Sequence, residues 1–109
     1  MPTVLSPSAI EQYLLSLPHW KETTVTHKNK QCLAIARQCD FANFREAWSF
    51  MQLVAIHAEE QAHHPDWRNV YKTVYITLYT WDIAGLSDKD LQLAQTIDRL
   101  YQQFLDNGS

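Results

Sequence analysis

Glycine and clustered basic residues are both scarce in this chain, and each shortage excludes a class of function. Two glycines among 109 residues cannot build the Gly-rich loops with which nucleotide-binding enzymes hold phosphate. The nine Lys and Arg residues form no basic run, and the formal net charge is −3. Nucleic acid is therefore not expected as a partner, because neutralising a phosphate backbone requires clustered cations.

The sequence also lacks long hydrophobic runs and has few cysteines. No segment approaches the roughly 18 apolar residues of a membrane span, and the first residues, "MPTVLSPS", do not resemble a signal peptide. Cys32 and Cys39 are seven residues apart, so in one strand they would point to opposite faces and could not pair. We expect a cytoplasmic protein without membrane contact, in which both cysteines remain reduced.

Hydrophobic residues are plentiful, at 46% of the chain, and include four Trp, five Tyr and four Phe. A chain of this size and composition is expected to form one domain over residues 1–109 with a packed core. We found no internal repeat, linker or low-complexity stretch that would divide it.

Three segments have helical periodicity. The first, "SPSAIEQYLLSLP", can begin at Ser6 with Pro7 in the first turn, or at a capping box of Ser8 and Glu11. Its expected apolar face is Ile10, Tyr13, Leu14 and Leu17. The last helix follows a capping box of Ser87 and Asp90, with Leu91, Ala94, Ile97, Tyr101 and Phe104 facing inward.

The longest predicted helix is "FANFREAWSFMQLVAIHAEEQA", with Asp40 as its expected N-cap. It carries two apolar stripes, which suggests a core face and a second face for a subunit contact. The expected core stripe is Phe41, Phe44, Trp48, Met51 and Ala55, and the second stripe is Phe50, Leu53, Ile56 and His57.

Two hairpins separate these helices. "WKETTVTHK" and "QCLAIARQ" are rich in alternating or β-branched residues, with a turn expected at Asn29-Lys30. In "DWRNVYKTVYITLYTW", Val74, Ile76 and Leu78 alternate with more polar residues, which predicts one buried face. The predicted order is α-β-β-α-β-β-α, an α+β fold with three helices on one face of a four-stranded antiparallel sheet.

The motif with the clearest chemistry is "EEQAHHPDW", in which His63 and His64 lie between a helix end and a proline. Imidazoles can interact with the last carbonyls of a helix, and they can also exchange protons near neutral pH. A zinc site would require a third ligand from Glu59, Glu60 or Asp66 and is less favoured. A planar ligand could stack on nearby aromatic residues, although for each of them alone packing is the favoured role: Trp67, Tyr79 and Trp81.

The segment from "FREAWSFMQ" to "AGLSDKD" resembles the pterin-4a-carbinolamine dehydratases, also called the dimerisation-cofactor family. The resemblance rests on Glu59 followed by His63-His64-Pro65, on Trp67 and "NVY", on "ITL", and on "AGLS" leading to Asp90; "LPHW" and "CDFANF" extend it over most of the chain. It implies the same element order and a homodimer joined through sheet edges, sometimes paired again into a homotetramer through the long helices.

The resemblance also implies an activity and its residues. These enzymes expel water from 4a-hydroxytetrahydropterin to give quinonoid dihydropterin, which recycles the pterin of aromatic amino-acid hydroxylases without a metal or further cofactor. By this resemblance His63 and His64 are the catalytic pair, and Glu59 orients or tunes an imidazole. Substrate contacts are expected from Ala62, Pro65, Tyr79, Thr80, Trp81 and Asp82, and supporting roles from Trp67 and Asp90. For Asp90, helix capping is the expected main role.

Two positions depart from the family pattern. Many members have a third histidine where this chain has Trp81, and an acidic residue where it has Ala62. Tryptophan can stack and donate one N–H, but it cannot exchange a proton at neutral pH. An alternative function is therefore a dehydratase-like binding module without catalysis, acting in transcription-factor dimerisation or rubisco assembly.

Overall fold

A computed structural model describes residues 4–108 of the chain. Its helices and strands follow the predicted α-β-β-α-β-β-α order, with one additional short 3-10 helix, η1. None of the helices in this described part is long and apolar enough to cross a membrane. The elements are α1 (Pro7–Leu15), β1 (Lys21–His27), β2 (Lys30–Asp40), α2 (Phe44–Gln61), β3 (Asp66–Val70), β4 (Thr73–Leu78), η1 (Trp81–Ile83) and α3 (Asp88–Gly108).

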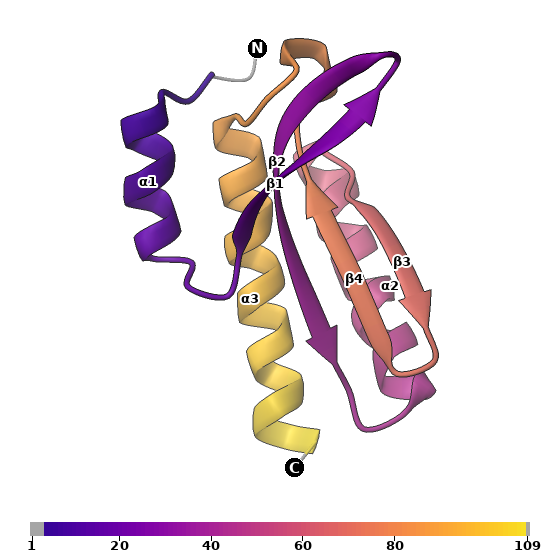
Figure 1. The fold of residues 1–109 in the computed structure, drawn as a ribbon. Helices are drawn as coiled ribbons and strands as arrows, with labels where there is room; N and C mark the ends of the chain where they lie inside the picture. The colour runs from indigo at the N-terminus through magenta and orange to yellow at the C-terminus, as the bar shows by residue number, and fades with distance from the viewer. Residues whose placement is uncertain (1–3, 109) are drawn as a thin grey trace.

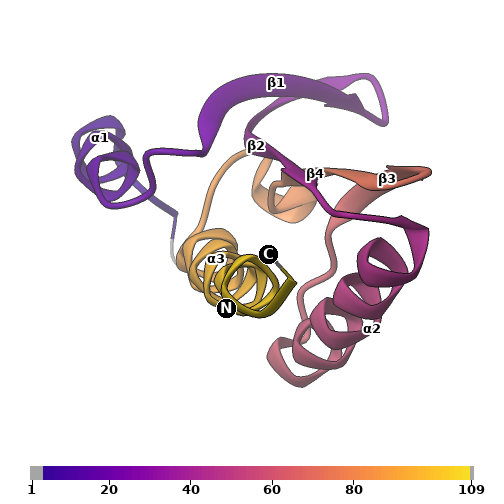
Figure 2. The same ribbon diagram turned by 90° about the horizontal axis from the view of Figure 1, so that it is seen from below.

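The four strands form one antiparallel sheet in the order β1-β2-β4-β3 (Figure 1). Helices α2 and α3 lie beneath its concave face, and α1 lies beyond α3 at the β1 end (Figure 2). This confirms the predicted α+β class. Strands β1 and β3 are the two edges of the sheet, so each has one side without a strand partner within the described chain.

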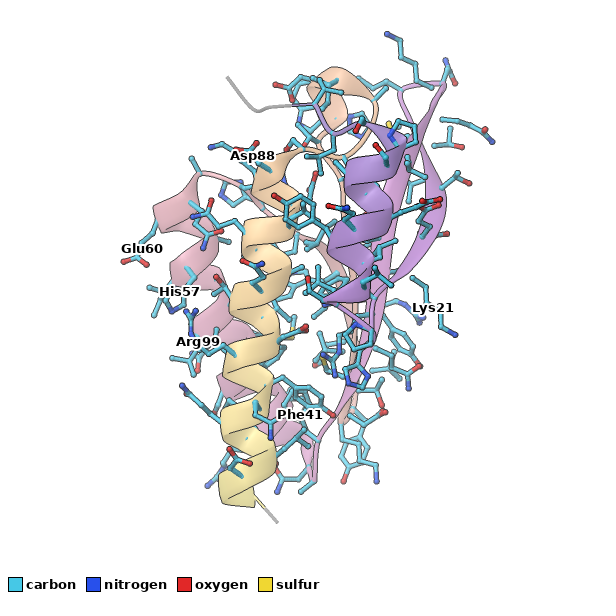
Figure 3. The ribbon with its side chains drawn as sticks, turned by 90° about the vertical axis from the view of Figure 1, so that its left-hand side faces the viewer. Lys21, Phe41, His57, Glu60, Asp88 and Arg99 are labelled. Atoms are coloured by element: carbon cyan, nitrogen blue, oxygen red, sulfur yellow. The ribbon has the colours of Figure 1, made fainter. Side chains whose placement is uncertain are left out.

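The core lies between the sheet and helices α2 and α3. Phe41, at the entrance to α2, is buried against Tyr101 and Phe104 of α3, with ring centroids 5.1 and 5.6 Å away. It lies beside the C-terminal half of α3 (Figure 3). The predicted inward residues of α3 are buried or, for Phe104, partly buried. In α1, Ile10 is buried but Tyr13 is exposed, which corrects part of its predicted face.

The helix starts follow capping chemistry, with one correction to the prediction. Ser6 caps α1 by accepting a hydrogen bond from the backbone N–H of Ala9 at 3.2 Å. Asn43, not Asp40, caps α2: its Oδ1 accepts from the N–H of Glu46 at 2.9 Å, and the Glu46 carboxylate accepts from the N–H of Ala42. The arrangement is close to a capping box, except that Glu46 accepts from the residue before the cap. Asp40 is instead the last residue of β2.

The buried face of α2 is the main error of the sequence prediction. The face that packs on the core is Ala47, Phe50, Val54 and Ala58. Phe44, Trp48 and Ala55 of the expected core stripe are exposed, and so are Leu53 and Ile56 of the second stripe. His57 and Glu60 form an ion pair at 3.3 Å on the side of the helix away from the sheet (Figure 3). The helix is apolar around most of its circumference, so periodicity alone could not select the face that packs.

The first hairpin turn lies one residue earlier than predicted. Lys28 and Asn29 are its two central residues, with φ of 51° and 66°, and His27 pairs with Lys30. Positive φ at both central positions is the geometry of a two-residue turn that matches the twist of the strands. Cys32 and Cys39 are both free and buried, as expected. Burial raises the pKa of the Cys39 thiol to about 12.

Candidate active site

The end of α2 directs the two adjacent histidines into different surroundings. Ala62 caps the helix in the left-handed conformation, with φ of 53° and ψ of 40°. The backbone N–H groups of Ala62 and His63 return to the carbonyls of Glu59 and Ala58, at 3.2 and 3.0 Å. Backbone groups therefore satisfy these carbonyls, and the two imidazoles bind carboxylates instead.

His63 points into the protein. It is only 9% exposed, and its Nε2 lies 2.5 Å from Oδ1 of Asp90, which is fully buried in the first turn of α3. Because a carboxylate accepts hydrogen bonds, we assign Nε2 of His63 as the donor in this pair. In a neutral imidazole this leaves Nδ1 as the acceptor.

The second oxygen of Asp90 is also fully occupied. Its Oδ2 accepts from the Thr80 hydroxyl at 2.7 Å and from the backbone N–H of Ser87 at 2.9 Å. The Ser87 contact is the capping interaction that the sequence predicts. The contact with His63 is additional, so Asp90 both caps α3 and fixes the imidazole.

His64 has the opposite environment. Its side chain is 65% exposed, and its Nε2 pairs with a carboxylate oxygen of Glu59, which is 76% exposed. Glu59, in the last turn of α2, therefore contacts His64 rather than His63. A pair this open to solvent is screened and holds its geometry only weakly.

Both imidazoles line one open cleft of about 390 Å³. Every residue predicted to contact the substrate lines it as well, namely Ala62, Pro65, Tyr79, Thr80, Trp81 and Asp82. Glu59 and Asp90 each contact one imidazole but do not line the cleft. Trp67, in β3, packs partly buried against the core and does not line this cleft.

Two further lining residues were not predicted as substrate contacts, Asp66 and Lys89. Asp66 directly follows Pro65, so the histidine motif itself could have indicated it. Lys89 precedes Asp90 and donates from Nζ to the backbone carbonyl of Gln61 at 3.0 Å, which ties α3 to the end of α2. No local sequence signal points to this contact.

Tyr79 and Trp81 form the aromatic wall of the cleft, where the chain leaves β4. Burial, followed by the nearby charge of Asp66, raises the pKa of Tyr79, so its phenol stays protonated and can donate a hydrogen bond. The indole of Trp81 is 55% exposed, and residues of the first hairpin turn contact it.

Groups of three or more His, Cys, Asp or Glu side chains placed to hold an ion are absent from residues 4–108. The two imidazoles instead have one carboxylate each. Such pairs are suited to holding and moving protons.

Comparison with known proteins defines the class. The family model described as "Pterin 4 alpha carbinolamine dehydratase" matches residues 3–100. The chain therefore belongs to this family, as the sequence predicted.

Individual relatives agree. A protein of Burkholderia vietnamiensis named "Putative pterin-4-alpha-carbinolamine dehydratase" is 49% identical over 87 residues, covering 80% of this chain and 79% of the relative. One of the same name from Nitrobacter hamburgensis is 40% identical over 100 residues, covering 92% and 93%. A crystal structure described as a transcriptional coactivator/pterin dehydratase from Brucella melitensis has a TM-score of 0.77 and 30% identity, covering 89% of this chain and 97% of the other.

Proposed function

We propose that this chain removes water from a 4a-hydroxytetrahydropterin to give a quinonoid dihydropterin, using His63 and His64 as acid and base. The observation that carries the proposal is the placement of two adjacent imidazoles, with different partners, in one cleft beside an aromatic wall. Membership of the family and the names of its relatives support the same reaction.

The reaction needs two proton movements. The C4a–O bond breaks as the hydroxyl takes a proton and leaves as water, while a neighbouring ring nitrogen loses its proton and a C=N bond forms. Loss of water changes no oxidation state, so the step requires no redox partner. Positioned groups with pKa values near neutrality accelerate such steps by about 10²–10⁴-fold each.

The different surroundings of the imidazoles favour different roles. Nε2 of His63 is paired with the buried carboxylate of Asp90 at 2.5 Å, which leaves Nδ1 as the acceptor, so we assign His63 as the base that accepts the ring proton through Nδ1. His64 faces solvent and can regain a proton from water after each turnover, so we assign it as the acid. Glu59 would hold the His64 ring in place.

The remaining contacts would orient the pterin. Its planar ring can lie against the aromatic wall of Tyr79 and Trp81, since stacking on an aromatic face favours planar ligands. Ala62 and Pro65 add short side chains to the lining, and Thr80 and Asp82 supply polar atoms. Trp81 stands where many relatives carry a histidine, so in this chain the two remaining imidazoles would carry all proton transfer.

The deciding experiment is a dehydration assay on chemically prepared 4a-hydroxytetrahydropterin, with and without EDTA. We expect the purified protein to accelerate dehydration equally in both conditions. Activity that disappears with EDTA and returns with zinc would overturn the acid/base assignment. Reconstitution with an aromatic amino-acid hydroxylase would then test the link to pterin recycling.

We also propose that the active form is a homodimer or homotetramer. Helix α2 exposes the apolar side chains of Phe44, Trp48, Leu53 and Ile56. Within residues 4–108, the outer sides of β1 and β3 have no strand partner. Surfaces of both kinds are typical of subunit contacts. Light scattering is expected to give a dimer or larger, and Trp48→Glu is expected to reduce a tetramer to dimers. A wild-type monomer at micromolar concentration would contradict the proposal.

The exposed face of α2 also favours a second candidate, a binding module without catalysis. The Brucella relative is described as a coactivator as well as a dehydratase. A wild-type protein that assembles normally but leaves the dehydration rate unchanged would support this function over the enzyme.

A further inference from the structure

The hairpin of β1 and β2 extends beyond the part of β2 that pairs with β4. Strand β2 runs from Lys30 to Asp40, but β4 pairs only with its part from Ile35 onward. Residues 30–34 pair with β1 alone. The end of the hairpin therefore projects past Leu78, the last residue of β4, toward the segment that enters η1 (Figure 1).

This projecting tip contacts the aromatic wall of the cleft. The His27 ring lies 5.5 Å from the Trp81 ring between centroids, tilted by 32°, and its Nδ1 lies 3.5 Å from the Tyr79 hydroxyl. The Lys28 ammonium lies 5.0 Å from the centre of the Trp81 ring. At that distance a cation is attracted to the face of an indole.

The aromatic wall depends on contacts from the hairpin tip, because Tyr79 and Trp81 follow the last residue of β4. Backbone bonds between Thr80 and Gly85 hold the main chain at this point, but Tyr79 and Trp81 lie beyond the last strand pair. His27 makes ring contacts with both side chains, and Lys28 contacts the Trp81 ring as well. His27 is half-buried at this junction, although it is 52 residues from Tyr79 in sequence.

We propose that His27 is a positioning residue for the substrate, acting through Tyr79 and Trp81. It holds the two side chains in the orientation that receives a planar ring, and Lys28 supports the indole beside it. The proposal rests on the dehydratase function proposed above. Fixing a binding wall in advance lowers the entropic cost of binding, so loss of His27 weakens substrate binding while the proton-transfer groups remain in place.

The kinetic test compares His27→Ala with His27→Phe, which keeps a ring but loses the nitrogen. His19→Ala is the matched control, because His19 is an exposed histidine before the other end of β1. Loss of a hydrogen bond and a ring contact is expected to raise KM about fivefold in His27→Ala, with kcat within about twofold of wild type. His27→Phe is expected to recover part of the loss, and His19→Ala to change neither constant.

A second measurement tests the contact without any reaction. In protein labelled with 5-fluorotryptophan, Trp81→Phe identifies the fluorine resonance of Trp81 among the four. His27→Ala is expected to shift that resonance and to leave those of Trp20, Trp48 and Trp67 unchanged.

The possible outcomes are distinguishable. A Trp81 resonance that does not respond to His27→Ala would overturn the proposal, and so would an unchanged KM. A fall in kcat as large as that of His63→Ala would show that His27 acts on the chemistry rather than on binding. If the wild type does not catalyse dehydration, the proposed function fails together with this role, while the fluorine shift still reports whether the tip holds Trp81.

Discussion

His63 and His64 are adjacent in sequence, but the protein places them in opposite surroundings. His63 belongs to a buried network in which Asp90 also accepts hydrogen bonds from Thr80 and Ser87. His64 belongs to an exposed pair with Glu59, which lies in the last turn of α2. The buried network joins three parts of the fold, whereas the exposed pair depends only on the end of α2.

The difference arises from one backbone conformation. Because Ala62 is left-handed, the chain reverses direction and the next two side chains diverge, one toward α3 and one toward solvent. The fold can therefore orient the first imidazole rigidly and leave the second free to exchange protons with water. The comparison predicts that mutations in the buried network act on stability and activity together, and that mutations in the exposed pair act mainly on activity.

The largest effect is expected from Asp90→Ala. The substitution leaves the His63 ring, the Thr80 hydroxyl and the Ser87 N–H without their shared acceptor, and breaking a buried network of this kind costs about 3 kcal/mol. Urea unfolding followed by tryptophan fluorescence should show this loss, and kcat should fall about 10²-fold as His63 loses its fixed orientation. Asp106→Ala, an exposed carboxylate of α3, is the control. A loss below about 1 kcal/mol would show that the network does not support the fold.

The next comparison is His63→Ala against His64→Ala. Both are expected to lower kcat by about 10²-fold, the usual effect of losing an acid or base. Only His63→Ala is expected to destabilise the protein, by about 1–2 kcal/mol, because it removes the hydrogen-bond partner of the buried Oδ1 of Asp90. Parallel measurements of kcat and unfolding free energy check both expectations. Equal stability losses would remove the contrast between the two sites.

Replacement of Trp81 by phenylalanine is expected to change substrate binding rather than turnover. Trp81→Phe keeps a stacking face and loses only an N–H, so KM should rise by a few fold while kcat stays within about twofold. Trp81→His adds a third ionisable ring and is expected to raise kcat if the cleft accepts it. If Trp81→Phe lowers kcat as strongly as His63→Ala, proton transfer is not confined to the two histidines.

The smallest effect is expected from Glu59→Gln. An exposed ion pair contributes about 0–1 kcal/mol, so the unfolding free energy should barely change. The kcat should fall by only a few fold, and the difference from wild type should shrink in high salt as the charge interaction is screened. Glu60→Gln, on the same turn but paired with His57, is the control. Losses of stability and kcat as large as those of Asp90→Ala would show that the exposed carboxylate of Glu59 matters as much as the buried one.

Local sequence signals were sufficient for much of this site. The helix-ending motif His63-His64-Pro65 and the strand leading to Tyr79 and Trp81 were recognisable in the sequence, and the cleft contains all of them. The capping box of Ser87 and Asp90 was also predicted. These features depend on residues close together along the chain, where hydrogen-bonding chemistry is strongly constrained.

Contacts between distant segments were not predictable in the same way. Asp90 lies 27 residues from His63, and its carboxylate could be assigned to the cap without any reference to the imidazole. His27 lies in a strand with no motif, and only the length of the hairpin beyond β4 brings it to Trp81. The prediction of the buried face of α2 was wrong for a related reason. Where apolar residues surround a helix, the neighbouring elements decide which of them are covered.

The projection of the β1–β2 hairpin beyond β4 has a consequence for protein engineering. The outer strand pairs of the tip involve β1 and β2 alone, so residues can be inserted or removed there without shifting the register of β4. The histidine network is anchored on the other side of the cleft, in α2 and α3. The residues of the tip can thus be replaced to redesign the range of accepted ligands while the reactive groups stay constant.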